Sequence, residues 1–387
     1  MSDFLTRNQL VLAKVETIPG TDIVPTPAAD SVLVDAPRGN PNMQLEQTDE
    51  ATGSLSNSQS IVGGGYREGS RMFYAKGSGV PGTAPEFAPY LQAAALGMTT
   101  LAVDSAGTAQ AGAAGQITLA VAAPSANLAG FVIETTGGTG PGQRRVIKSY
   151  NTATKVAVVY PNFTVIPDAT TTYAVRAGNV FAPVSTALKT LSEYRYKKNA
   201  GSGNAVLEKM VGAMNGLSFA VESGKTGKFT ASLRGQLLAP IDVANPVGAV
   251  FDSVRPRPML NSDAFLDGVA VCFRNFTLDF GLEMTQPDCP GQLFGYDPTI
   301  ITDRKVTGRL NPRQVTLSQR NPFADMVAGT TKPLWLNWGE TLGNKVSMLL
   351  PAISYTGNEE DDLDKVMADG LPFDANGFDG EVLICFY

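Results

Sequence analysis

The alternation of apolar and polar residues along this chain predicts a mainly β protein. The clearest case is 228–237, where Phe229, Ala231, Leu233 and Leu237 share one face and polar residues occupy the other. A period of two is typical of an antiparallel strand with one face in the core and one in water. Further strands are predicted at 116–121, 131–135, 144–150, 155–160, 172–176, 269–282, 305–310, 345–350 and 381–387.

One predicted strand changes phase. In 269–282 the apolar positions Val269, Val271 and Phe273 are followed by a second set that starts at Phe276, so the alternation slips by one residue. Arg274-Asn275 lies at the switch, which predicts a β-bulge there or a strand that passes between two environments.

A single amphipathic helix is predicted between Thr83 and Gly97. Thr83 and Glu86 have the spacing of a capping box, while Pro89 cannot donate a helical hydrogen bond and so marks the start of the regular helix. The apolar face points to packing on a sheet. It consists of Phe87, Tyr90, Leu91, Ala94, Ala95 and Met98.

The remaining segments suggest the domain organisation. Residues 1–30 contain four Pro or Gly interruptions and are interpreted as an extended arm, and 41–70 as a long polar loop. An Ala- and Gly-rich change of composition near residue 103 opens a series of tight strands. The sequence thus predicts a host domain in two parts, 1–102 and 179–387, with a small all-β domain inserted at 103–178.

Composition agrees with strands joined by turns. The chain has 387 residues, of which 43% are hydrophobic and only 17% charged, with 40 glycines and 25 prolines. The net charge of −6 is local, because the last 43 residues alone carry nine acids and two lysines. A protein that binds nucleic acid tightly is expected to carry a stripe of basic residues, and none is obvious in this sequence. The short runs 195–198 and 255–257 are interpreted as solvated loop charges.

The sequence contains few candidate catalytic groups. The chain has no histidine, which removes the commonest general base and metal ligand, and its three cysteines lack zinc or redox spacing. No secretory signal or membrane-length apolar run is visible, so the chain is expected to be made in a reducing cytoplasm. We expect neither an enzyme, nor a cofactor, nor a bound metal.

Four local features invite functional interpretations, and the structural one is preferred for each. The glycines at 138, 140 and 142 resemble a phosphate loop but precede a predicted strand rather than a helix, which favours a turn. The acidic run 359–364 lacks the spacing of a calcium loop and is interpreted as a solvated or intersubunit acidic loop. The serines at 54–60 have no base to activate them. Trp335 and Trp338 could stack on a ligand, though alternation along a strand accounts for them.

Four stretches are similar to the tail tube (major tail) proteins of siphophages. The first has Glu16 followed by Gly20-Thr21-Asp22 and Pro25, and the last is Leu371–Asn376, similar to the family's ending. The matches cover 14–98 and 181–387, whereas 103–178 resembles a small β module of phage structural proteins. The stretches are Lys14–Asp22 with Val24–Thr26, Gly77–Leu91 with Leu96–Met98, Gly212-Ala213 and Gly216–Phe219 with Glu222–Lys225 and Phe229, and Leu371–Gly377.

The resemblance implies a tail-tube-type antiparallel β-sandwich or barrel with one short helix. Such subunits form hexameric rings that stack into a hollow tube through which double-stranded DNA and the tape-measure protein pass without specific binding. Expected partners are therefore further copies of the chain and other tail proteins, in a virion tail assembled in the host bacterial cytoplasm. The inserted domain is expected outside the tube, so that its deletion would leave tubes intact. Residues expected at ring-stacking or subunit contacts are Phe4, Leu5, Leu55, Ile61, Tyr66 and Arg67.

Three alternatives stay open. The chain could be another ring-forming tail component, such as a terminator or distal tail protein, whose rings never elongate. It could be a carbohydrate-binding adhesin that uses the insert and the tryptophans as its binding surface. An enzyme is the remaining alternative.

Overall fold

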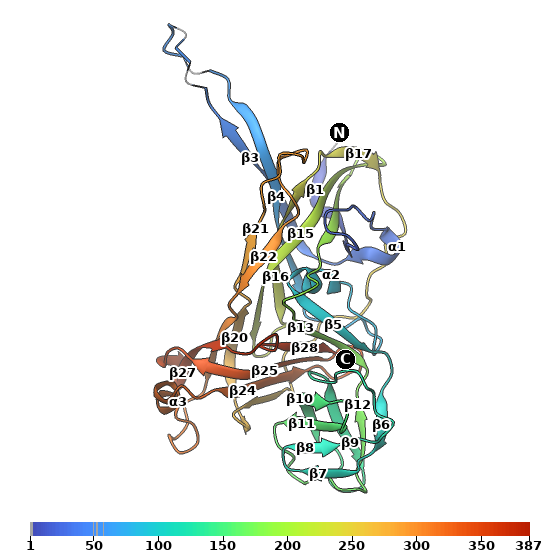
Figure 1. Ribbon diagram of the computed structural model, residues 1–387, viewed down its shortest axis with the longest axis vertical. Coiled ribbons are helices and arrows are strands. Elements are labelled where there is room, and N and C mark those ends of the chain that lie inside the picture. The colour runs from blue at the N-terminus through green and yellow to red at the C-terminus, as the bar shows by residue number, and fades with distance from the viewer. Residues whose placement is uncertain (1–2, 49, 52, 57) are drawn as a thin grey trace.

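The structure is a computed structural model that describes residues 3–48, 50–51, 53–56 and 58–387. Strands hold 51% of the residues and helices 4%, which confirms the mainly β class. The molecule is elongated, with a hairpin projecting from one end and a small domain at the other (Figure 1).

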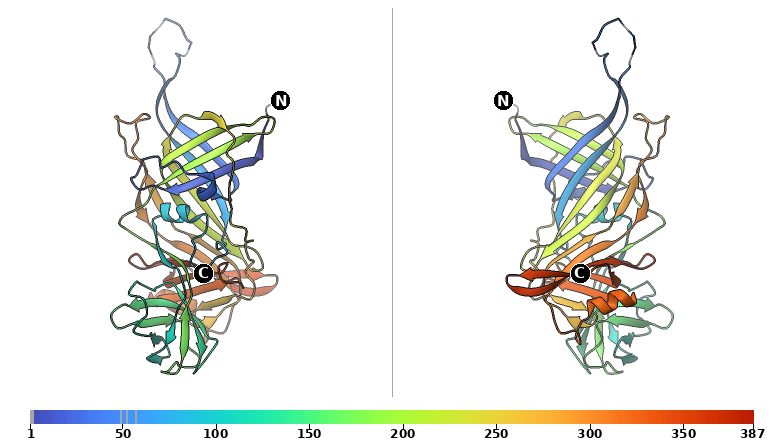
Figure 2. Two further views of the ribbon diagram at one scale, coloured as in Figure 1. Left: turned by 90° about the vertical axis from the view of Figure 1, so that its right-hand side faces the viewer. Right: turned by 90° about the vertical axis from the view of Figure 1, so that its left-hand side faces the viewer.

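Seven antiparallel strands form a continuous sheet, here called the front layer, which the right-hand view of Figure 2 shows face on. Its side chains alternate between a buried inner face and an outer face in water. Phenylalanines line the inner face, with Phe229 between Phe73 and Phe219 at ring-centroid distances of 5.7 and 4.7 Å. In spatial order the strands are β3 (Asp35–Glu46), β4 (Ile61–Tyr74), β16 (Lys228–Leu237), β15 (Asn204–Glu222), β20 (Phe273–Asp279), β23 (Thr307–Pro312) and β27 (Val366–Ala375).

The remaining strands of the large sheet, except β26, form a back layer across the core. β15 belongs to both layers, because its first half pairs with β14 and its second half with β16 and β20. The back layer contains β1 (Phe4–Val15), β2 (Ser31–Val32), β5 (Leu96–Leu101), β13 (Gly178–Pro183), β14 (Leu191–Asn199), β17 (Ile241–Ala244), β18 (Asp263–Leu266), β19 (Val269–Ala270), β24 (Lys332–Trp338), β25 (Val346–Tyr355) and β28 (Leu383–Phe386).

Short elements complete the host domain. The helix α2 (Ala88–Ala93) lies between the layers and buries Tyr90 and Leu91 completely. β26 (Glu359–Leu363) extends the front layer as an edge strand beside β27. A separate ribbon of β21 (Leu282–Thr285) and β22 (Ile300–Arg304) lies near the outer face of β15, and the other helices are α1 (Pro27–Asp30) and α3 (Pro322–Ala328).

A second sheet of seven strands lies within residues 105–175. It has its own core around Ile117, Phe131 and Tyr173, and this core is continuous with Cys385 and Tyr387 of the host. A further apolar cluster joins Tyr160 of this domain to Trp335 of β24. In order, the strands are β6 (Ser105–Thr108), β12 (Thr172–Val175), β9 (Val132–Gly137), β10 (Arg144–Asn151), β11 (Val156–Tyr160), β8 (Gln116–Thr118) and β7 (Ala111–Ala113).

Several predictions of local structure are confirmed. β16 has the predicted bounds and alternation, and the pairing of β20 with β23 shifts register between Phe273 and Phe276, where the bulge was predicted. Both backbone amides of that bulge, at Arg274 and Asn275, donate to the Asn311 side chain. The glycines at 138, 140 and 142 have positive φ and form the turn between β9 and β10.

Five predictions of local structure are wrong. The run 195–198, interpreted as solvated loop charges, lies in β14, where Arg195 is buried and donates to Glu208. The arm 1–30 contains β1, whose apolar run Leu10–Ala13 is buried because it pairs with the distant β14. The loop 41–70 is largely the β3–β4 hairpin, and the acidic loop 359–364 is largely β26. The described residues form three short helices rather than one. Local pattern missed β1 because its partner lies far away in the sequence, and it missed β26 because that edge strand has no buried face.

The inserted sheet covers apolar side chains of the host, which bears on its removal. Trp335, Leu349 and Leu383 form one cluster with Val146 and Tyr160 of the inserted sheet. Each large apolar side chain that becomes exposed to water lowers the free energy of unfolding by about 2 kcal/mol.

We therefore expect that replacing 103–178 with a short Gly-Ser linker lowers the melting temperature of the host domain. The tryptophan emission should shift to the red, because the contact of Trp335 with the insert is lost. The deleted chain should also be less soluble, because Leu349 and Leu383 lose their cover. Polar substitutions of these two residues should restore the solubility. An unchanged melting temperature would show that the two domains are energetically independent.

Candidate assembly surface

The outer face of the front layer is a broad polar surface. On β16 and β15 it presents Thr230, Ser232 and Ser218, and β20 continues it with Asn275 and Thr277. The large aliphatic and phenylalanine side chains of these strands point inward, because neighbouring strands keep their alternation in register. The inserted domain lies on the opposite side of the molecule, as the two views of Figure 2 show.

Most basic groups on this face are matched by carboxylates. Arg234 pairs with Glu68 at 2.9 Å and Arg309 with Glu359 at 2.7 Å. Further along, Lys305 pairs with Asp374 at 3.3 Å. Exposed pairs of this kind add little stability, but they leave few cations free for phosphate groups. The face is therefore polar without being a basic stripe.

The β3–β4 hairpin extends beyond the body of the molecule (Figure 1). Its last hydrogen bonds to the body come from Gln44, which donates to the Tyr296 hydroxyl at 2.6 Å, and from the Gly65 amide. Beyond them Leu45, Leu55 and Ile61 are exposed, and Leu55 is completely so. An isolated two-stranded hairpin is marginally stable in water, and clustered exposed apolar side chains indicate a contact surface.

A buried charge cluster fixes the lower part of the hairpin. Glu208 of β15 accepts hydrogen bonds from Arg195 and Lys197 of β14 and lies 3.4 Å from the guanidinium of Arg67 on β4. Burial alone would raise the pKa of Glu208. The hydrogen bonds from Lys197 and Arg195, together with the charges of Arg195 and Arg67, outweigh burial, so the pKa of Glu208 lies below the ordinary glutamate value.

A second buried pair lies beside it. Arg71 of β4 donates to Glu193 of β14, with Nε 2.9 Å from the carboxylate, and the Tyr90 hydroxyl of α2 donates to the same carboxylate at 2.7 Å. Burial, and next the charge of Glu193, raise the pKa of Tyr90. The two clusters tie the hairpin to β14, β15 and α2, so the projecting segment has a rigid base.

The motif residues at the start of the chain are structural. Glu16 is buried and accepts hydrogen bonds from the hydroxyls of Thr190 and Ser192 and from the amides of Gly20 and Gly212, all within 2.8 Å. Both glycines have positive φ, and a Cβ on either would clash with Pro298. Glu16 therefore joins two of the sequence stretches, 14–22 and 212–229, in one hydrogen-bonded node.

The residues expected at subunit contacts fall into three groups. Leu55 and Ile61 lie on the hairpin, and Phe4 and Leu5 are exposed at the start of β1, which pairs with β14. Tyr66 is half-buried in an edge-to-face contact with Tyr296. Arg67 is buried against Glu208, so it supports the hairpin from within the chain. Contact of any of these residues with a second copy stays a prediction.

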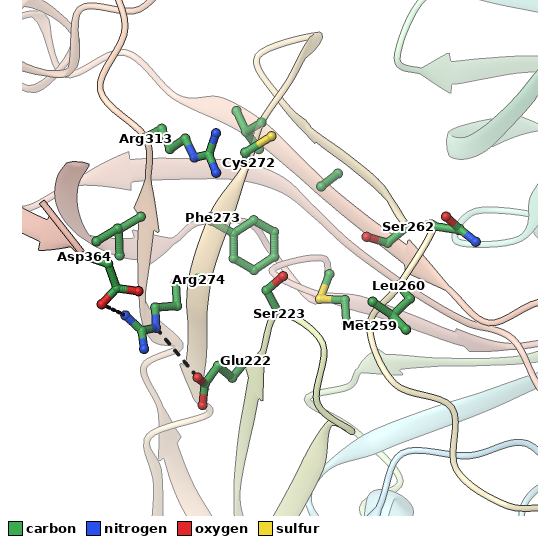
Figure 3. A pocket seen from close by; sticks show the side chains of 14 residues that line it. Glu222, Ser223, Met259, Leu260, Ser262, Cys272, Phe273, Arg274, Arg313 and Asp364 are labelled. Carbon is green, nitrogen blue, oxygen red and sulfur yellow. Dashed lines mark hydrogen bonds and ion pairs between the residues drawn. The ribbon is translucent and has the colours of Figure 1, made fainter. Parts of the chain in front are cut away.

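A cleft of about 700 Å³ opens at the end of the front layer away from the hairpin tip, and we call it the basal cleft (Figure 3). Met259 and Ala264 are buried in its floor, with Phe273 half-exposed beside them. Arg274 lies at the rim between Asp364, at 3.4 Å, and Glu222, at 3.7 Å. Its lining residues are Glu222, Ser223, Met259–Ser262, Ala264, Val271–Arg274, Arg313, Leu363 and Asp364. No local pattern in the sequence indicates this cleft, because its walls come from five separate segments.

Neither the models of known protein families nor the curated proteins gave a match.

The described residues contain no cluster of three or more Cys, Asp or Glu side chains placed to hold a metal ion. Trp335 and Trp338 are buried, so neither is exposed to stack on a sugar as the adhesin alternative requires. None of the described helices is long and apolar enough to cross a membrane.

Replacing Glu208 with glutamine should destabilise the protein at neutral pH by about 3 kcal/mol, because Arg67 and Arg195 lose their buried partner. A carboxyl whose pKa is lowered by folding contributes stability above its unfolded pKa, near 4.3, and loses it as the pH falls. The difference between wild type and Glu208→Gln should therefore shrink between pH 6 and pH 3 in urea unfolding. Glu340→Gln, at an exposed position that forms no ion pair with a described residue, is the control. A difference independent of pH would contradict the charge-based explanation.

Proposed function

We propose that this chain is the tail tube subunit of a long non-contractile phage tail. In this proposal its rings stack into a hollow tube that conducts DNA to the host, and it assembles in the host cytoplasm. The observation that carries the proposal is the front layer, a continuous antiparallel sheet with an apolar inner face and a polar outer face. A channel wall for DNA needs a surface that stays hydrated and does not hold phosphates.

The arrangement of the two other parts supports this function. The hairpin projects from one end of the front layer, where it can reach a neighbouring ring. The inserted domain lies on the side away from the polar face, which places it outside the tube if that face lines the lumen. The sequence stretches similar to tail tube proteins, Glu16–Asp22 among them, supply buried structural contacts rather than catalytic groups.

Negative-stain electron microscopy of the purified chain tests the proposal. Wild type at high concentration should form hollow rings and tubes with a lumen wide enough for duplex DNA. Replacing residues 46–61 with an Asn-Gly turn should preserve the fold but stop growth at single rings, because the projecting contact is lost. The exposed Val121→Ser substitution in the inserted domain is the control and should leave tubes unchanged. Particles that stay monomeric at every concentration and never extend a preformed tube would contradict the proposal.

The matched charges of the front layer give a second test. In the double variant Glu68→Gln and Glu359→Gln, Arg234 and Arg309 lose their carboxylate partners. Tubes of this variant should retain short DNA duplexes that wild-type tubes release. The logarithm of the affinity should depend more steeply on salt, by about one unit per freed cation. Glu340→Gln provides the matched control, and equal retention by all three tubes would argue against DNA passing along this face.

A further inference from the structure

The β21–β22 ribbon continues two strands of the front layer and then leaves that layer. The pairing of β20 with β23 resumes, after a bend at Gly281, as the pairing of β21 with β22. Gly281 has a φ of 52°, and a Cβ there would lie 2.1 Å from the Lys305 carbonyl oxygen, so the bend requires glycine. Beyond the bend the ribbon forms a sheet of its own and rises along the body towards the hairpin (Figure 1). Gly281 is therefore the point about which the ribbon can turn.

The loop at the far end of the ribbon supports the base of the projecting hairpin. The Gly65 amide donates to the Phe294 carbonyl oxygen at 3.0 Å, and Gln44 donates to the Tyr296 hydroxyl at 2.6 Å. The Tyr296 ring also packs edge-to-face on Tyr66, with 5.7 Å between the ring centroids. A displacement of the hairpin base therefore acts on the ribbon.

The end of the ribbon next to the bend holds the segment that leads into β28. Arg304 forms ion pairs with Asp379 at 2.8 Å and with Glu381 at 3.0 Å. Its guanidinium also donates to the Val184 carbonyl oxygen at 3.2 Å. A few residues further along the chain, Cys385 packs in the core of the inserted domain. Arg304 thus connects the ribbon to the junction between the host and inserted domains.

The ribbon is weakly held against the body. Every residue of β21 and β22 is exposed or half-buried, and Arg234 holds the ribbon through the Met284 carbonyl oxygen at 3.3 Å. Buried polar atoms at its contacts have no hydrogen-bond partner among the described residues. They are both amide atoms of Gln286, Nε of Arg234 and one carboxylate oxygen of Glu381. Unpaired buried polar groups lower local stability, so the ribbon can shift at a small cost in free energy.

We propose that the β21–β22 ribbon is a hinged lever that couples the base of the hairpin to the junction with the inserted domain. The hairpin base acts on the far end of the ribbon, the ribbon turns at Gly281, and Arg304 passes the movement to the segment before β28. This inference does not rest on the proposed function, because it concerns contacts within one chain. In the proposed tube, a contact made at the hairpin would reach the inserted domain on the outer side.

Cys385 provides a reporter for the junction, because it is buried between the two domains and becomes accessible when they separate. The rate at which a thiol reagent labels it is measured on the native chain, with Cys272→Ser and Cys289→Ser removing the other thiols. Tyr296→Ala, which frees the hairpin base from the ribbon, should raise the labelling rate at least fivefold. Tyr196→Ala, at a half-buried tyrosine of β14, is the matched control and should leave the rate within twofold. No change with Tyr296→Ala would overturn the inference.

Arg304→Gln distinguishes a lever from general loosening of the fold. It should raise the labelling rate of Cys385 by itself, because its ion pairs with Asp379 and Glu381 are lost. Tyr296→Ala added to it should give no further increase, because the ribbon is already disconnected from the junction. Additive effects of the two substitutions would contradict the coupling. So would labelling that rises only as far as the global free energy of unfolding, measured in urea, falls, because Cys385 would then report global unfolding.

The bend at Gly281 gives an independent test. Gly281→Ala should raise the labelling rate of Cys385 at least fivefold, because the added methyl group clashes with Lys305 and displaces the ribbon. Gly224→Ala is the matched control, since its φ of 78° imposes a similar backbone strain while its Cβ position is open. This control should leave the rate within twofold, and equal effects of the two substitutions would argue against a hinge at Gly281.

Discussion

The change of layer within β15 is the constraint on which the rest of this structure depends. The strand bends at Gly212, whose φ of 59° is unfavourable for any other residue and whose amide donates to the buried Glu16 at 2.8 Å. The pairings of β15 with β14 and with β16 both shift register around this point. One strand can therefore pair with the back layer before the bend and with the front layer after it. The polar face and the apolar core keep their sides only because this register is fixed.

The charge clusters transmit that register to the projecting hairpin. Glu193 and Glu208 come from β14 and β15, and their arginine partners Arg71 and Arg67 come from β4. Charges buried at this depth are costly unless each is paired, so a slip of one residue between these strands would leave unpaired ions inside the protein. The same alternation places Glu68 and Ser70 on the outer face, in water. The clusters thus determine the direction in which the hairpin leaves the body and the side on which the polar face lies.

The proposed assembly function would account for several features of the molecule together. An extended hairpin with exposed apolar side chains, a cleft with an apolar floor and a polar sheet with matched charges lie in line along one face. The pKa values of Tyr90 and Glu208 depart from their ordinary ranges because both groups lie in the buried charge clusters that hold the base of the hairpin.

The sequence by itself determined the β class, the strand β16, the bulge at Arg274-Asn275 and the turn at 138–142, because each depends on local alternation or on the conformation of glycine. It predicted a long loop around Leu55 and Ile61, where the structure has the β3–β4 hairpin. Only the tertiary structure decided that 4–15 and 359–363 are strands and that Trp335 and Arg67 are buried, because the groups that cover or pair with them come from other strands. The polar face and the basal cleft were decided in the same way. Each is assembled from separate strands, whose order follows from pairing across the sheet and not from any local pattern.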